Sequence, residues 1–254
     1  MTDNTADTPV VLVTGSARRI GAAIVQKFHQ EGCNVIIHCN HSRQEAEALQ
    51  KQLCSLRSDS AALIAADLLL DADRNRLASE TLECFGRLDV LVNNASVFYP
   101  TEFGTVEEEQ WNELMDSNLR AAYFLCQQLK NELQLRNGSI VNIVDTHADN
   151  PLANHSVYNI AKAGLKAMTK SLAKDLAPGI RVNGVSPGAI LWPARLEEKK
   201  DSTTDAIKAG ILRQIPLGHL GTVEDIAAAV YFLGHSASYV TGQVIRVDGG
   251  RALS

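Results

Sequence analysis

Short apolar runs alternate with longer amphipathic stretches along nearly the whole chain. The apolar runs predict strands over residues 10–13, 34–38, 61–66, 88–92, 139–144, 180–185 and 244–247. Between them apolar residues recur with helical spacing, which predicts helices from residue 20 onward and over 44–56, 71–84, 111–133, 156–176 and 223–233. Such regular alternation predicts an α/β fold, a doubly wound parallel sheet of the Rossmann type with helices on both faces.

Nothing in the composition divides the chain. No linker rich in Pro, Gly or Ser, no repeat and no low-complexity tract interrupts the 254 residues, so we predict a single domain spanning residues 1–254. An apolar content of 45% is ample for its core. One polar and charged segment, residues 189–210, stands apart from the core pattern and follows the tripeptide Ser186-Pro187-Gly188.

Charge and cysteine usage exclude several classes of protein. A net charge of -5 argues against nucleic acid as a partner. The first residues lack a basic segment followed by an apolar one, and no run reaches the roughly 18 apolar residues of a membrane helix. The five scattered cysteines show no metal-binding spacing. We therefore expect a cytoplasmic protein without a metal site and without membrane contact.

The candidate chemistry centres on three residues. Tyr158 and Lys162 are four positions apart, so they share one face of the predicted helix. An ammonium close to a phenol favours its ionised form. Asp145 lies where the preceding strand ends, which is the edge of an α/β sheet where sites gather. Its negative charge opposes ionisation of the phenol, so we expect the two effects to keep Tyr158 protonated.

The first predicted strand runs into a glycine turn. Gly15 and Gly21 bracket the sequence between this strand and the first helix. Glycines allow close approach of a pyrophosphate, and a helix N-terminus offers it free N–H groups. The second strand ends without the carboxylate that usually holds the ribose of NAD. Side chains able to donate to a 2′-phosphate gather there instead, and we predict that His38, Asn40, His41, Ser42 and Arg18 hold NADPH.

These motifs together resemble the short-chain dehydrogenase/reductases, from about residue 10 to residue 250. Three features resemble the pteridine reductase branch of this family. Arg19 replaces a glycine of the TGxxxGxG turn, Asp145 replaces the usual catalytic serine, and residues 93–100 read NNASVFYP. The ending Asp248-Gly-Gly also matches the family.

The resemblance implies a role for each site residue. It implies that Asp145, Tyr158 and Lys162 are catalytic and that Arg19, Ser96, Phe98, Asp145 and Tyr158 bind a pterin. It implies cofactor contacts at Gly15, Arg18, Arg19, Ile20, Gly21, His38, Asn40, His41, Ser42, Asp67, Leu68, Asn94, Ala95, Ser96, Tyr158, Lys162, Pro187 and Gly188. Segment 189–210 corresponds to a substrate lid, and relatives are commonly homotetramers.

We therefore expect NADPH-dependent reduction of a dihydropterin or dihydrofolate to its tetrahydro form, with Tyr158 and Asp145 supplying the proton. An ionised carboxylate only accepts hydrogen bonds, so Asp145 suits a substrate with N–H groups better than a simple ketone. Two alternatives stay open. One is a carbonyl or 3-oxoacyl reductase, which should have Ser at position 145 and Gly at position 19. The other is a non-catalytic NADPH-binding regulator, which should lack Tyr158 or Lys162.

Overall fold

The computed structural model describes residues 8–192 and 201–253, and its centre is a seven-stranded sheet. The strands are β1 Val10–Val13, β2 Asn34–Cys39, β3 Ala61–Ala65, β4 Val90–Asn93, β5 Ser139–Ile143, β6 Arg181–Pro187 and β7 Val244–Val247. They lie in the order β3-β2-β1-β4-β5-β6-β7, and every neighbouring pair is parallel. The predicted doubly wound sheet in a single domain is confirmed.

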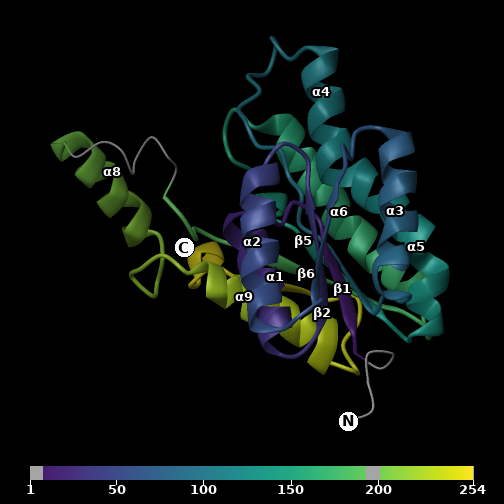
Figure 1. Ribbon diagram of the computed structural model, residues 1–254. Coiled ribbons are helices and arrows are strands. Elements are labelled where there is room, and N and C mark those ends of the chain that lie inside the picture. The colour runs from purple at the N-terminus through teal and green to yellow at the C-terminus, as the bar shows by residue number, and fades with distance from the viewer. Residues whose placement is uncertain (1–7, 193–200, 254) are drawn as a thin grey trace.

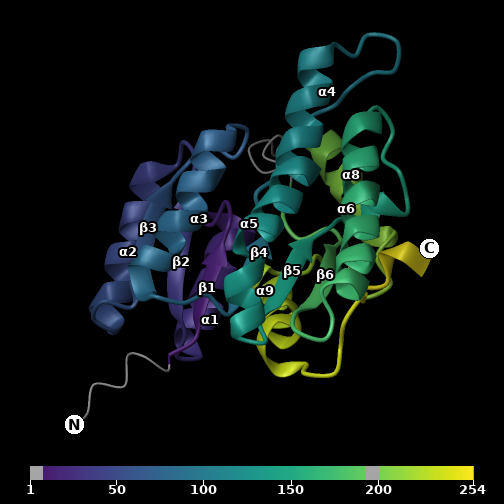
Figure 2. The ribbon, with the colours of Figure 1, turned by 90° about the vertical axis from the view of Figure 1, so that its right-hand side faces the viewer.

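Two helical layers enclose the sheet (Figure 1). Helices α1 Arg19–Gln30, α2 Arg43–Leu56 and α9 Val223–Tyr231 cover one face. Helices α3 Asp71–Phe85, α5 Ala121–Leu135 and α6 Ser156–Asp175 cover the other. The turned view in Figure 2 shows α4, Glu108–Met115, rising beyond the upper edge of the sheet.

Strand β1 shows why the sheet needs both layers. Its four residues are all buried, and successive side chains point to opposite faces. Val11 and Val13 join the core beneath α1 and α9, whereas Val10 and Leu12 join the core beneath α5 and α6. An unbroken apolar run is therefore the pattern that a central parallel strand requires.

The predicted helix over residues 111–133 is a composite. It consists of α4, the π-helical turn η2 Asp116–Arg120, and α5. A second π-turn, η4 Phe232–Ser236, extends α9. Such a turn is a single i→i+5 irregularity inside a longer helix, and the periodicity of the whole segment did not reveal it.

The segment expected to be a lid is described only in part. Helix α8, Ser202–Arg213, begins after Asp201, whose side chain accepts a hydrogen bond from the Thr204 N–H at 2.7 Å. It projects to one side of the molecule in Figure 1. Residues 193–200 of this predicted lid lie outside the described residues. Within the described ranges, no helix combines the length and apolar character needed to cross a membrane.

Candidate active site

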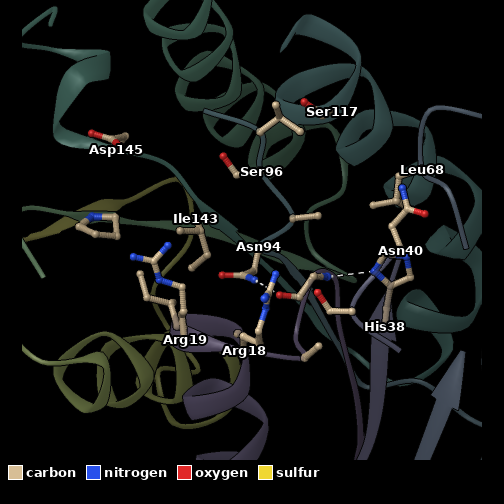
Figure 3. Close-up of a pocket in the computed structure, with 18 of the residues that line it drawn as sticks. Arg18, Arg19, His38, Asn40, Leu68, Asn94, Ser96, Ser117, Ile143 and Asp145 are labelled. Atoms are coloured by element: carbon tan, nitrogen blue, oxygen red, sulfur yellow. Dashed lines mark hydrogen bonds between the residues drawn. The ribbon is translucent and has the colours of Figure 1, made fainter. Parts of the chain in front are cut away.

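The carboxyl ends of the central strands border a cavity of about 730 Å³ (Figure 3). It lies where the strand order reverses between β1 and β4, the usual place for ligands in open α/β sheets. All but one of the predicted site residues line it: Gly15, Arg18, Arg19, Ile20, Gly21, His38, Asn40, His41, Ser42, Asp67, Leu68, Asn94, Ala95, Ser96, Asp145, Tyr158, Lys162, Pro187 and Gly188. We call residues 15–21, 38–42, 67–68 and Asn94 the cofactor end, and Ser96, Asp145, Tyr158 and Lys162 the catalytic end.

Gly15 is held in a turn that only glycine fills easily. Its φ is +61°, and a Cβ atom would lie 2.8 Å from the Cα atom of Ala95. The Asn94 side chain donates to the carbonyl oxygens of Thr14 at 2.8 Å and Gly15 at 2.9 Å. Asn94 thus fastens the glycine turn to the end of β4.

The two arginines of the turn differ in their surroundings. Arg18 Nη1 lies 3.2 Å from Glu45 Oε1, in an exposed ion pair. Arg19 has a φ of +54°, in the left-handed region that disfavours every residue with a Cβ atom. The Arg19 side chain reaches the cavity (Figure 3), and no hydrogen-bonding or ionic partner holds its guanidinium among the described residues. This position therefore keeps the backbone of a glycine while presenting a free positive charge.

His38 does not have the role that we predicted from the sequence. Its Nδ1 accepts a hydrogen bond from the Gly15 N–H at 2.9 Å, drawn as a dashed line in Figure 3. Its Nε2 lies 3.1 Å from the Ala66 carbonyl oxygen, which can only accept. Both ring nitrogens are occupied, so the prediction that His38 donates to a 2′-phosphate is wrong. Asn40, His41 and Ser42 follow it on the cavity wall.

At the catalytic end, Tyr158 donates a hydrogen bond to Asp145. The distance from Tyr158 Oη to Asp145 Oδ2 is 2.7 Å. The other carboxylate oxygen, Oδ1, accepts from the His147 N–H at 2.8 Å. Asp145 reaches this position because it caps the short 3-10 helix η3 Thr146–Ala148 just after β5. The carboxylate is therefore fixed from both sides and orients the phenol.

Burial is the main influence on the ionisation of Tyr158 and Lys162. It raises the pKa of Tyr158 far above its usual value, and the charge of Asp145 raises it further, so the phenol is protonated at neutral pH. Burial lowers the pKa of Lys162 to about 8, against the opposing effect of Asp145. Lys162 Nζ donates to the Ile143 carbonyl at 3.0 Å and lies 5.6 Å from the centre of the Tyr158 ring. We expected Lys162 to lower the pKa of Tyr158, but Lys162 is not among the main causes of the pKa shift of Tyr158.

The π-turn η2 supports the catalytic end. Asn118, within this turn, accepts from the Ser96 hydroxyl at 2.7 Å. Its amide donates to the carbonyl oxygens of Val97 and Leu114, both at 2.9 Å. The Ser96 hydroxyl is thereby held close to Tyr158, whose pKa it lowers slightly against the larger effects.

Phe98 is the predicted residue that does not line the cavity. Its side chain is 54% exposed. The ring stacks on His155, with centroids 4.7 Å apart, and meets Tyr158 edge to face at 4.8 Å. Phe98 thus lies beside the catalytic tyrosine without forming the cavity wall.

The sequence analysis missed several lining residues. They are Ala17, Cys39, Leu69, Val97, Glu113, Ser117, Ile143 and Val144, whereas the lining residues Ala189, Ile190 and Leu191 belong to the predicted lid segment. Most of these missed residues are direct neighbours in sequence of residues that were predicted. The strand ends were therefore identified correctly, but too few residues around each were included. Glu113 and Ser117 lie one helical turn apart, and only their shared face signals a common wall. Within the described residues, no group of acidic, His and Cys side chains could hold a metal ion.

Comparison with known proteins defines the class. A family model described as "Enoyl-(Acyl carrier protein) reductase" matches residues 15–252. The chain belongs to the short-chain dehydrogenase/reductase family and is an oxidoreductase of that family, as the sequence motifs predicted.

The names of three curated relatives give an activity other than the pteridine reduction that we expected. The 3-oxoacyl-[acyl-carrier-protein] reductase FabG of Staphylococcus aureus strain Mu50 is 36% identical over 247 residues, covering 96% of this chain and 98% of the relative. The proteins of the same name from strains MW2 and N315 match to the same extent. These relatives favour the first alternative of the sequence analysis over a pteridine reductase.

Proposed function

We propose that the protein is an NADPH-dependent pteridine reductase. The observation that carries this proposal is the carboxylate of Asp145, which accepts the hydrogen bond of Tyr158 Oη at 2.7 Å. A ketone oxygen needs hydrogen-bond donors as negative charge develops on it. An ionised carboxylate offers none. It matches a pterin, whose edge carries N–H groups, while Tyr158, which Asp145 orients, donates the proton that the ring nitrogen gains.

The cofactor end fits a dinucleotide phosphate. A Cβ atom on Gly21 would lie 2.5 Å from the Gly15 carbonyl oxygen, so only a glycine leaves this turn open at the start of α1. The N-terminus of α1 can then hold a pyrophosphate. Asn40, His41 and Ser42 line the wall without a carboxylate that would repel a 2′-phosphate. NADPH, when bound, supplies the hydride.

Each residue of the catalytic end has a distinct task in this proposal. Tyr158 is the proton donor, because its raised pKa keeps the phenol protonated. Asp145 orients that phenol and receives N–H groups of the pterin. Lys162 holds the nicotinamide ribose. Arg19 and Ser96 bind the pterin edge, and Phe98 packs edge to face on Tyr158 from outside the cavity wall.

Arg19 gives this assignment a second line of support. Its left-handed backbone costs about 1 to 2 kcal/mol relative to glycine. The free guanidinium faces the cavity, where binding of a ligand can offset this cost. A planar guanidinium suits a flat heterocycle or a phosphate, both of which the proposal places there.

The second candidate is a 3-oxoacyl-[acyl-carrier-protein] reductase. The 36% identity to proteins of that name over 96% of the chain favours it. Tyr158 and Lys162 serve ketone reduction equally well. Asp145 and Arg19 are the residues that speak against it.

A steady-state assay of NADPH oxidation separates the candidates. The substrates are dihydrobiopterin, dihydromonapterin, dihydrofolate and a 3-oxoacyl thioester, each also offered with NADH. We expect kcat/KM for one of the pterins to exceed that for the thioester by at least about 10²-fold. The reverse order would establish the second candidate, and cofactor binding without turnover of any substrate would favour the non-catalytic alternative.

We also propose that the protein acts as a cytoplasmic homotetramer. Its described surface exposes large apolar side chains on and near α4 and α5, among them Phe103, Trp111, Tyr123 and Leu135. Strand β7 leaves one edge of the sheet without a neighbouring strand among the described residues. Both features suit contacts between copies, and sedimentation analysis measures the resulting mass.

A further inference from the structure

A single buried histidine joins three parts of the cofactor end. His38 lies at the end of β2 and is 2% exposed. Its ring connects the Gly15 N–H, beyond β1, to the Ala66 carbonyl oxygen, beyond β3. Its backbone adds two bonds to the same turn, because the Ser16 N–H donates to the His38 carbonyl at 2.8 Å and the His38 N–H donates to Ser16 Oγ at 3.1 Å.

The partners of the ring define one protonation state. A backbone N–H only donates, so Nδ1 must be the bare nitrogen. A carbonyl oxygen only accepts, so Nε2 must carry the hydrogen. A protonated imidazolium would set an N–H against the Gly15 N–H. Burial lowers the pKa of His38 to about 4, which agrees with a neutral ring.

We propose that His38 is a positioning residue, a neutral clamp that holds the glycine turn and the loop after β3 in the shape that accepts a dinucleotide. The Gly15 and Ser16 N–H groups are both used by His38, so the N–H groups of the following residues at the start of α1 are those left for a pyrophosphate. The Ala66 carbonyl immediately precedes Asp67 and Leu68 on the cavity wall. His38 therefore sets the affinity for the whole dinucleotide and not the preference for the phosphate.

This inference rests on the proposed use of a nicotinamide dinucleotide, and it makes a distinct prediction about selectivity. A ligand of the 2′-phosphate would affect only NADPH. A clamp on the glycine turn affects binding of the pyrophosphate, which NADPH and NADH share. The ratio of the two dissociation constants therefore distinguishes the roles.

Two substitutions separate the two hydrogen bonds of the ring. In His38→Asn the amide oxygen replaces Nδ1 and keeps the bond to Gly15. In His38→Gln the amide N–H replaces Nε2, keeps the bond to Ala66 and loses the bond to Gly15. We expect His38→Gln to raise Kd for both NADPH and NADH by about tenfold, or about 1.4 kcal/mol, with their ratio unchanged. The separate variant His38→Asn should keep most of the affinity of the unmodified protein for both nucleotides.

Fluorescence titration with each nucleotide measures these constants, and His219→Gln is the matched control. His219 is an exposed histidine that does not line the cavity. Its replacement should change Kd for either nucleotide by less than about twofold. A loss of NADPH affinity alone in His38→Gln would make His38 a phosphate ligand, and unchanged binding of both nucleotides would remove it from the cofactor site. Either result overturns the proposal.

A measurement on the unmodified chain covers the case in which these variants do not fold. Long-range ¹H–¹⁵N correlation spectra of ¹⁵N-histidine protein report the state of each ring nitrogen without added nucleotide. We expect one of the seven histidines to keep a bare Nδ1 and a protonated Nε2 from pH 5 to 8. If every histidine titrates in that range, the clamp does not exist, whatever the enzyme reduces.

Discussion

The cofactor end and the catalytic end of the cavity are held in place by different kinds of interaction. At the cofactor end, neutral groups hold backbone: Asn94 and His38 bind the glycine turn from opposite sides. At the catalytic end, Tyr158 and Lys162 are ionisable and buried, and the pKa values of both are displaced from their usual range. The interactions at the cofactor end fix the shape of the glycine turn, whereas those at the catalytic end set the protonation of Tyr158 and Lys162.

The difference separates the features that the family shares from those that are particular to this chain. A turn held by backbone bonds serves any reaction that uses the same dinucleotide. The catalytic end, by contrast, contains the aspartate that departs from the usual family pattern, and Arg19 reaches into the cavity from the glycine turn. Substitutions at the two ends should therefore affect different kinetic constants.

The largest effect is expected for Tyr158→Phe. It removes the phenol hydroxyl but keeps the ring that contacts Phe98. Loss of a general acid costs about 10²–10⁴-fold, so kcat should fall by about 10³-fold while the affinity for NADPH is kept. Stopped-flow turnover and fluorescence titration measure the two quantities. If the affinity for NADPH fell as much as kcat, the cofactor end and the catalytic end would not be independent.

The pH dependence should reveal Lys162. Its pKa of about 8 means that the ammonium loses its proton above that pH, so kcat should fall about tenfold per pH unit between pH 8 and 10. Tyr158 stays protonated there. Stability should change in the opposite sense: the unfolded chain, with a lysine pKa near 10.5, binds more protons in this range, so the contribution of Lys162 to the free energy of unfolding rises with pH. If kcat instead began to fall only near pH 10, the loss of activity would belong to another ionisable group.

Arg19→Gly should improve stability while it impairs binding. The glycine relieves the positive φ of +54°, so the free energy of unfolding should rise by about 1 kcal/mol. Loss of the guanidinium should raise KM for the pterin by about tenfold. Asp59→Gly is the matched control, because Asp59 has a φ of +53° in an exposed turn away from the cavity. It should stabilise the fold without changing KM, and an unchanged KM in Arg19→Gly as well would remove Arg19 from the substrate site.

The smallest effect is expected for Glu45→Gln at the edge of the cofactor end. The change frees Arg18 from its exposed ion pair and makes its charge available to a 2′-phosphate. Exposed pairs contribute little, so Kd for NADPH should fall by about two- to threefold, with Kd for NADH unchanged. An equal change for both nucleotides would mean that Arg18 does not sense the phosphate.

The sequence predicted the fold because apolar runs and helical spacing report burial directly. All seven strands and the helices on both faces appear as expected, whereas α8 was not predicted within the polar segment 189–210. At the site, strand ends and the glycine turn identified most of the lining residues but not those on a helix face, such as Glu113 and Ser117. The orientation of His38 and the φ of Arg19 depend on contacts between strands that are distant in the chain, and the sequence pattern does not record them. For the same reason the rim position of Phe98 was missed.

The central claim is that Asp145 adapts this family's catalytic end to a pterin. The most direct test is the ratio of kcat on a dihydropterin to kcat on a 3-oxoacyl thioester, measured for the unmodified protein and for Asp145→Ser. We predict that Asp145→Ser lowers this ratio by at least about 10²-fold, because serine replaces the charged carboxylate acceptor for pterin N–H groups by a neutral hydroxyl and restores a donor for a ketone. NADPH affinity, measured alongside, should not change. An unchanged ratio would contradict the claim and leave Asp145 as the cap of a short helix.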